Sequence, residues 1–221
     1  IDGSLNTLSD RPGMDSQKTD TFGLKVIREN TYSQFQSLTS TTDTDVVFSY
    51  DADWGNTNSH APYTYDYFSE TLRARESLSQ EFRFVSNDRY KTERLPFDWV
   101  VGFSYLKLNE TNDRQDDGIY GDPNDPFSPY SSLVTSNSDY SSTNISVFGN
   151  IEYEFTGFTK LSLGLRMEDW SAKYFDSNDE RFNPSDSMMG GKVSLTHAFD
   201  EDKNVFANYA KGYKQGGFNI G

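Results

Sequence analysis

The stretch ISVFGNIEYEFTGFTKLSLGLRME, residues 145–168, alternates apolar and polar side chains in two runs separated by a short break. In the first run Val147 and Ile151 fall on one side of an extended chain, and Asn150 and Glu152 fall on the other. In the second run one side carries Leu161, Leu163, Leu165 and Met167. A period of two is typical of a β-strand with one apolar and one polar face. The two runs therefore predict two strands joined by a tight turn at residues 156–158.

The same alternation recurs along the whole chain of 221 residues. It predicts about eight strands, at 18–27, 31–50, 70–87, 96–110, 141–155, 159–173, 188–199 and 203–214. A tilted strand needs about 9–11 residues to cross the hydrocarbon of a bilayer, whereas strands of soluble proteins average about 5–6. Most of the predicted strands reach the longer figure, which favours a membrane.

The connections between these strands alternate in length. Short links are predicted at 28–30, 86–95, 156–158 and 200–202, and long polar links at 51–69, 111–140 and 174–187. Outer-membrane barrels have short turns on one rim and long loops on the other. We therefore expect an all-β fold made of antiparallel, up-and-down transmembrane β-barrel strands. Aromatic side chains near the strand ends are expected at the bilayer interface. They are Trp54, Tyr63, Tyr65, Tyr67, Phe68, Trp170 and Tyr174.

Composition narrows the classes of protein further. Aromatic residues make up 15% of the chain although hydrophobic residues make up only 34%, which does not fit a disordered chain. The formal charge of −14 argues against nucleic acid as a partner. The chain has no cysteine, so neither a disulfide nor a thiolate metal site is expected. The sequence shows no convergent catalytic set and no cofactor motif, so we expect no enzyme. His197 is interpreted as structural, and His60 lies in a long loop.

The polar faces of the strands carry charges of both signs, at Glu81, Arg83, Glu152, Glu154, Arg166 and Glu168. We expect these six side chains to face the barrel interior, where polarity is needed. The alternative is that they are solvent-facing side chains of an open sheet.

A further acidic stretch, with Asp113, Asp116, Asp117, Asp122 and Asp125, permits a calcium interpretation. It departs from the EF-hand pattern at Pro123 and Pro126, so a solvated loop is favoured.

Four segments resemble strands of TonB-dependent receptor barrels. LSLGLRME (161–168) resembles an L-x-x-G-x-R-x-E strand, and VFGNIEY (147–153) is similar to the strand before it. SQEFRF (79–84) is similar to an S-Q-E-L-R strand. NYAKGYKQGGFN (208–219) resembles a Y-A-x-G-Y-K-x-G-G-F-N segment and is the most specific of the four. The segments follow the family's order from about residue 70 to the end of the chain.

The resemblance implies an outer-membrane transporter with a barrel of roughly 22 strands around a plug domain. Its partners would be outer-membrane lipid, its own plug, the TonB complex and a small nutrient, most simply a ferric siderophore. Residues 1–221 then form an interior part of the barrel domain, without the plug, the TonB box and the C-terminal closing strand. By the same resemblance, the long loops help to capture the ligand, and Tyr120, Phe127 and Tyr130 are the candidate contacts.

Two other functions remain open from the sequence. A passive porin-type barrel shares every physical signal and differs only in the family motifs. A soluble all-β carbohydrate-binding module would bury its apolar strand faces against a second sheet.

Overall fold

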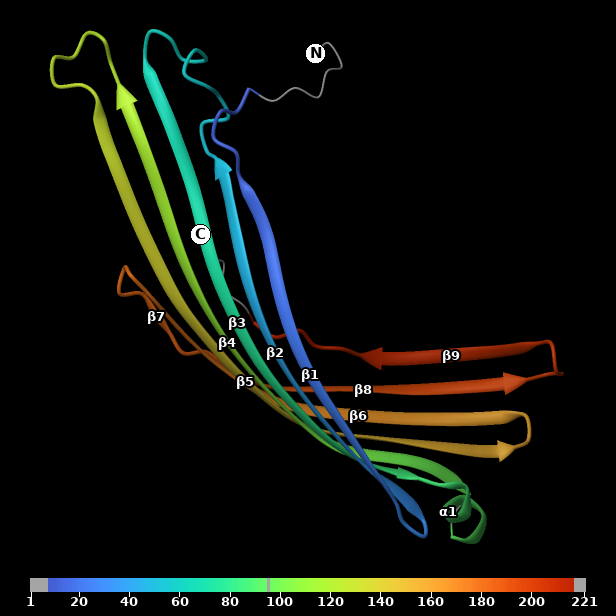
Figure 1. Cartoon of the computed structure of the whole chain (residues 1–221). Coiled ribbons are helices and arrows are strands. Elements are labelled where there is room, and N and C mark those ends of the chain that lie inside the picture. The colour runs from blue at the N-terminus through green and yellow to red at the C-terminus, as the bar shows by residue number, and fades with distance from the viewer. Residues whose placement is uncertain (1–7, 95, 217–221) are drawn as a thin grey trace.

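The computed structural model describes residues 8–94 and 96–216, and they form one strongly curved antiparallel sheet (Figure 1). The strands are β1 (Met14–Glu29), β2 (Ser33–Asp51), β3 (Thr64–Ser86), β4 (Phe97–Gly121), β5 (Tyr130–Thr156), β6 (Thr159–Asp176), β7 (Arg181–Phe182), β8 (Ser185–Ala198) and β9 (Asn204–Lys211). Their order in the sheet follows the chain, β1-β2-β3-β4-β5-β6-β8-β9, with the short β7 paired to β6 alone. This is up-and-down connectivity, in which each long strand hydrogen-bonds to the next along the chain.

All eight predicted strands are present, so the predicted fold class is confirmed. The predicted links also fall alternately at the two ends of the strands. One end, here called the short-turn end, carries residues 30–32, 87–94, 96, 157–158 and 199–203. The other, here called the long-connection end, carries residues 52–63, 122–129 and 177–184. The described residues form a single layer, with no second sheet over either face (Figure 1).

The long connections are shorter than predicted, because the strands extend beyond the expected boundaries. β4 continues to Gly121 and β5 begins at Tyr130, so most of the predicted loop 111–140 is paired strand, in which β4 lies between β3 and β5. Asp113, Asp116 and Asp117 therefore lie on β4 and not in a loop. The prediction was wrong here because aspartate and asparagine, which are frequent in this stretch, are depleted in strands, and because both faces of these strands are polar.

The link after β3 contains a helix that the sequence did not predict, α1 (Asp88–Glu93). The Asn87 side chain caps it by accepting from the Tyr90 backbone N–H at 3.1 Å. Tyr90 packs edge-on against Trp99, with ring centroids 5.7 Å apart. Across the rim, Nζ of Lys91 lies 2.9 Å from Oδ2 of Asp98. α1 therefore packs against the start of β4 at the short-turn end. Among the described residues no helix is long and apolar enough to cross a membrane.

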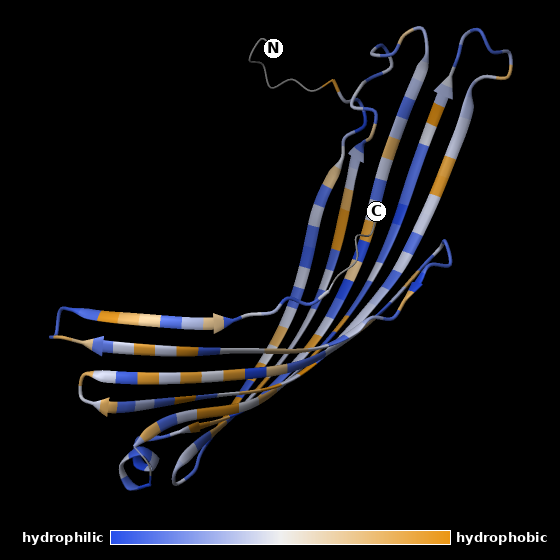
Figure 2. Ribbon diagram, turned by 180° about the vertical axis from the view of Figure 1, so that it is seen from behind, coloured by the Kyte–Doolittle hydropathy of each residue, from blue (hydrophilic) through white to orange (hydrophobic). Residues whose placement is uncertain are grey.

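Cross-strand register divides the side chains into two faces. Phe103, Val147, Met167 and Met189 oppose one another across β4, β5, β6 and β8, and therefore share one face, here the apolar face. The same face carries Phe22, Leu24, Val26, Phe35, Leu78, Phe82, Phe84, Trp99, Val101, Ile145, Ile151, Leu161, Leu163, Leu165, Val193, Leu195 and Val205. Figure 2 shows the alternation along the strands as bands of orange and blue.

These apolar side chains are open to the surroundings, as a lipid-facing surface requires. Val147, Leu165 and Met167 are 52%, 52% and 50% exposed, and no described segment covers them. In water, an apolar belt of this extent would be costly to leave uncovered. In hydrocarbon the same belt is stable, because strand alternation places neighbouring charged side chains such as Arg166 and Glu168 on the other side.

The opposite face, here the polar face, holds most of the buried side chains. Trp170, Ala172, Tyr174 and Met188 are at most 8% exposed and lie on this face. Met188 on β8 is directly opposite Glu168, and the other three follow Glu168 along β6. The prediction that Trp170 and Tyr174 lie at the bilayer interface was therefore wrong. Both sit at even positions on β6, which share the face of Arg166 and Glu168 and not that of Leu165.

Candidate functional site

All six charged residues singled out from the sequence lie on the polar face. Glu81, Ser104, Ser146 and Glu168 form one cross-strand row, from β3 to β6. The neighbouring row is Arg83, Gly102, Phe148, Arg166 and Gly190. Two ion pairs therefore lie at the same level on either side of β4 and β5: Glu81 with Arg83, and Glu168 with Arg166.

The carboxylate of Glu168 is buried, with 7% of the residue exposed, and it accepts hydrogen bonds from four side chains. Its Oε2 accepts from Arg166 Nη2 at 2.8 Å and from the Tyr213 hydroxyl at 3.0 Å. Its Oε1 accepts from Asn144 Nδ2 at 2.7 Å and from Gln215 Nε2 at 2.6 Å. A buried carboxylate is stable only with partners of this kind. The carboxylate of Glu168 thus joins β5, β6 and the segment after β9 at one point.

The segment after β9 crosses the polar face and does not continue the strand, which was predicted to reach residue 214. Residues 212–216 are not part of a strand, and the hydroxyl of Tyr213 is hydrogen-bonded to both Arg166 and Glu168. Gly190 makes room for this, since a Cβ atom there would lie 2.8 Å from the carbonyl oxygen of Lys211 and 3.0 Å from the Tyr213 ring. The end of the predicted motif, Gly217–Asn219, lies outside the described residues.

Phe148 fills the middle of the polar face between the two acid–base pairs. A Cβ atom on Gly102 would lie 2.4 Å from the Phe148 ring, so the ring lies directly over the backbone of β4. The Arg166 guanidinium is 5.7 Å from the ring centroid and 3.5 Å from Oγ of Ser104. The sequence pattern places Phe148 among the polar residues of its strand, but it does not predict that the ring packs over Gly102.

Glu152 and Glu154 lie apart from this cluster, near the short-turn end. Oε2 of Glu152 is 3.7 Å from Nζ of Lys160, and Oε2 of Glu154 is 3.9 Å from Nζ of Lys91 on α1. Both pairs are open to solvent, so they contribute little stability. The six charged residues therefore form three groups along the strands, and the structure does not bring them into one site.

A row of tyrosines crosses the polar face at the long-connection end. Tyr65 on β3, Tyr120 on β4 and Tyr130 on β5 oppose one another directly and are 43%, 38% and 49% exposed. Tyr67 packs beside Tyr65 with ring centroids 4.6 Å apart, and His60 meets Tyr65 at 5.2 Å. The sequence singled out Tyr120 and Tyr130 as loop residues, whereas the structure places them on strands.

The connection 122–129 adds one further aromatic residue to this end. Phe127 lies within it and is 80% exposed, so it does not pack on the tyrosine row. Beside it, the Tyr130 hydroxyl donates to Oδ2 of Asp125 at 2.5 Å. This bond raises the pKa of Tyr130 and lowers the pKa of Asp125, because it favours a protonated phenol against an ionised carboxylate.

Three side chains of these two clusters were missed by sequence reasoning: Asn144, Tyr213 and Gln215. Each is polar, and each contacts Glu168 from a distant part of the chain, which no local pattern reveals. His197 accepts or donates a hydrogen bond with the Thr159 hydroxyl at 2.8 Å and fits its predicted structural role. Within the described ranges, no group of three or more His, Asp and Glu side chains could hold a metal ion.

One long-stranded antiparallel sheet, with an exposed apolar belt on one face and paired charges on the other, defines a membrane-spanning β-barrel segment. The chain belongs to the TonB-dependent receptor-like β-barrel family, whose model matches residues 2–221. This is a family of outer-membrane receptors, so the outer membrane is the location of the chain. The predicted family and location are thereby confirmed.

Solved structures share the fold at low sequence identity. The ferric yersiniabactin uptake receptor FyuA from Yersinia pestis is 16% identical, with a TM-score of 0.67 over 92% of this chain and 29% of that one. The ferric-catecholate import receptor Fiu from E. coli K12 is 15% identical, with a TM-score of 0.63 over 93% of this chain and 37% of that one. The copper transporter OprC is 14% identical, with a TM-score of 0.60 over 90% of this chain and 31% of that one. No curated protein matches the chain.

Proposed function

We propose that the chain is an interior part of the barrel of a TonB-coupled receptor that imports a scarce nutrient, most simply a ferric siderophore. The family match over residues 2–221 carries this proposal. The chain spans 29% and 37% of two solved receptors that take up ferric chelates. The remaining strands would pair with β1 and β9, since unpaired strand edges in hydrocarbon are too costly to persist.

The proposal places the long-connection end outside the cell and the short-turn end in the periplasm. The tyrosine row of Tyr65, Tyr120 and Tyr130 then stands at the outer mouth, with Phe127 in the connection above it. Exposed aromatic rings offer large contact area to a planar or aromatic chelate at little entropic cost. These rings would be the first ligand contacts.

The polar face would line the lumen and meet the plug. Glu81, Arg83, Arg166 and Glu168 present both signs of charge at one level, which suits docking of a folded domain better than passage of ions of one sign. Glu152 and Glu154 would border the periplasmic exit. Energy from the TonB complex would act on the plug rather than on these strands.

The test is ligand binding and uptake by the complete receptor that contains this segment. Substitution of Tyr120 and Tyr130 by alanine should weaken binding of the ferric chelate about tenfold for each ring that contacts it. Tyr153→Ala, an aromatic removal at the short-turn end, is the matched control and should leave binding unchanged. Uptake that persists without TonB would favour a passive porin. If all three substitutions changed binding equally, the proposal that the tyrosine row contacts the ligand would be contradicted.

A further inference from the structure

Residues 8–13 precede β1 and do not continue its line. They turn across the end of β2 toward β3, beside the connection 52–63 at the long-connection end (Figure 1). Where the turn meets β1, the Met14 N–H donates to Oγ of Ser49 at 2.9 Å. We call residues 8–13 the strap.

Arg11 anchors the strap on β3 and β4. Its Nη1 atom lies 3.2 Å from Oδ1 of Asp66 and 3.0 Å from Oδ2 of Asp117. Its guanidinium lies 4.4 Å from the ring centroid of Phe68. The sheet order is β1-β2-β3-β4, so the strap has to cross β2 to reach these partners. A single side chain therefore joins the strap to two strands that are not neighbours of β1.

The anchor lies on the same side of the sheet as the apolar belt. Phe68 and Asp117 oppose each other across β3 and β4, as Phe82 and Phe103 do further along. Each pair of positions is separated by an even number of residues, so alternation places all four side chains on one side. The strap therefore covers the outer side of the sheet, beyond the belt.

The surface under the strap is acidic. The rows from Ser49 to the strand ends carry four carboxylates on this side of β2, β3 and β4, and no lysine or arginine of these strands shares those rows. The four are Asp51, Asp66, Glu70 and Asp117. Asp51 is only 6% exposed, because the strap passes over it. Without the charge of Arg11, these carboxylates would repel one another and the acidic start of the strap at Asp10.

The strap also holds the connection 52–63. The carbonyl oxygen of Leu8 accepts from Nδ2 of Asn56 at 3.1 Å. Oδ2 of Asp10 accepts from the Thr57 N–H at 3.2 Å. The position of the connection therefore depends on the strap, and through it on Arg11.

The same connection borders the tyrosine row. The His60 ring packs against Tyr65, with ring centroids 5.2 Å apart. Oδ2 of Asp53 accepts from the Tyr67 N–H at 2.7 Å. A movement of the connection 52–63 would therefore change the space beside Tyr65.

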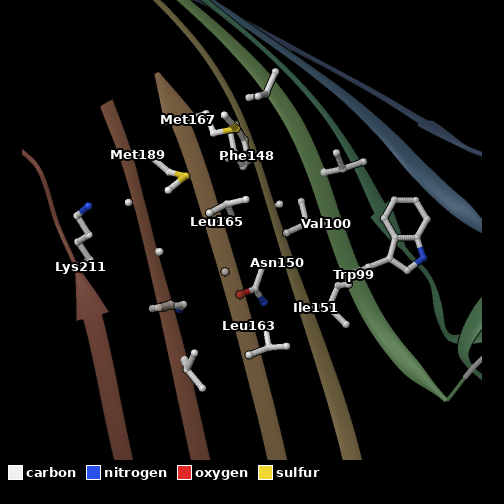
Figure 3. A pocket seen from close by; sticks show the side chains of 18 of the residues that line it. Trp99, Val100, Phe148, Asn150, Ile151, Leu163, Leu165, Met167, Met189 and Lys211 are labelled. Carbon is white, nitrogen blue, oxygen red and sulfur yellow. The ribbon is translucent and has the colours of Figure 1, made fainter. Parts of the chain in front are cut away.

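The strap lies in a different medium from the apolar face below it. A hollow of about 920 Å³ lies there within the belt, and Leu165, Met167 and Met189 are among its lining residues (Figure 3). The hydrocarbon that surrounds the belt fills such a hollow. Beyond the belt the medium is water, so ion pairs and not apolar contacts have to hold the strap, and salt screens them.

We propose that the strap is a conformational brace that sets how far the connection 52–63 stands from the tyrosine row. While Arg11 is paired, the strap keeps the connection against the outer side of the sheet. When the pairs are broken, the strap detaches and the connection moves more freely beside Tyr65. The effect on ligand access rests on the proposed function, whereas the brace itself does not.

The experiment measures the strap in the complete receptor, in bilayers and without ligand. Spin labels at L8C and I119C report the distance from the strap to β4 by double electron–electron resonance. Ile119 is suitable because it is the direct neighbour of Asp66 and is 41% exposed. R11Q should raise the detached population about tenfold, because two surface ion pairs and a cation–π contact are lost together.

Two further variants separate the brace from a general effect of lost charge. D66N/D117N removes both partners without altering the strap and should detach it as R11Q does. K18Q is the matched control, since Lys18 pairs with Asp20 at 3.1 Å on β1, away from the strap. K18Q should keep the parent distance.

A label at N58C tests whether the strap holds the connection. It should move faster in R11Q and in D66N/D117N than in K18Q. An unchanged distance in both anchor variants would overturn the proposal, and so would a detached strap with unchanged motion at position 58. No ligand enters these measurements, so they stand or fall separately from the uptake test of the proposed function.

Discussion

The hydroxyl of Tyr213 lies 3.0 Å from Oε2 of Glu168, and this contact ties the segment after β9 to β6 across the polar face. The same carboxylate is bonded to Arg166, Asn144 and Gln215. Glu168, together with Arg166, therefore anchors Tyr213 and Gln215 on the polar face. If the polar face lines the lumen, this segment narrows the space available to a plug or a ligand.

Glu168→Gln should release residues 212–216 and destabilise the sheet by about 1–3 kcal/mol, because Arg166 and Tyr213 lose a charged acceptor in a buried place. Hydrogen exchange of residues 208–216 and the urea midpoint measure the two effects. Glu152→Gln removes the same charge from an exposed pair and should cost less than about 1 kcal/mol. Equal effects of the two substitutions would show that the Glu168 network has no special role.

Gly190→Ala should displace Tyr213, since the added methyl group would lie 3.0 Å from the tyrosine ring and 2.8 Å from the Lys211 carbonyl oxygen. Hydrogen exchange of residues 212–216 reports the displacement. Gly23→Ala is the matched control, because a Cβ atom at Gly23 meets nothing within 4 Å. An unchanged Tyr213 environment in Gly190→Ala would contradict the described path of the chain.

Asp125→Asn should bring the pKa of Tyr130 back toward its ordinary value of 10.0, because the bond to Asp125 is the main cause of its rise. The bond stabilises the connection 122–129 while Asp125 is ionised and Tyr130 is protonated. Its contribution is therefore lost as the pH falls through the lowered pKa of Asp125, and again as the pH rises through the raised pKa of Tyr130. Ultraviolet titration of Tyr130 in both chains checks this. An identical titration curve would mean that the bond does not form.

Val147→Lys should destabilise the folded barrel in bilayers by about 2–4 kcal/mol, because it places a charge on the lipid-facing surface. Leu106→Lys is the control: Leu106 is also apolar and exposed, at 41% against 52% for Val147, but it lies on the polar face. Its substitution should be tolerated. Folding into vesicles, followed by resistance to heat and detergent, measures both. A larger cost for Leu106→Lys would reverse the assignment of the two faces.

The alternation at 145–168 was sufficient to predict strands over 145–155 and 161–168 and the turn between them, because apolar residues occupy alternate positions in both runs, with Phe148 as the exception. The same pattern fails beyond the bilayer, where both faces of β4 and β5 are polar. There the sequence predicted a loop and the structure has strands up to Gly121 and from Tyr130. Pairing between two polar strands depends on the partner strand, and a local pattern does not show it.

The sequence predicted which strand face carries the charged residues of the candidate site, but not the hydrogen bonds between them. Period two placed Arg166 and Glu168 on one side of β6 together with Glu152 and Glu154 on β5. It did not show that Asn144, Tyr213 and Gln215 converge on Glu168, since these contacts depend on strand register and on the turn of the chain after β9. The row formed by Tyr65, Tyr120 and Tyr130 could not be predicted from the sequence, because it depends on the register of β3, β4 and β5.

A cysteine scan along β6 tests the central claim most directly, because the chain has no native cysteine. Single cysteines at positions 161–168 of the complete receptor in bilayers would carry spin labels, and their collision with oxygen and with a water-soluble nickel chelate would be compared. Labels replacing Leu161, Leu163, Leu165 and Met167 should meet oxygen dissolved in lipid, and labels at positions 162, 164, 166 and 168 should not. Equal oxygen access at all eight positions, or greater access at the even ones, would contradict a sheet whose apolar face meets lipid.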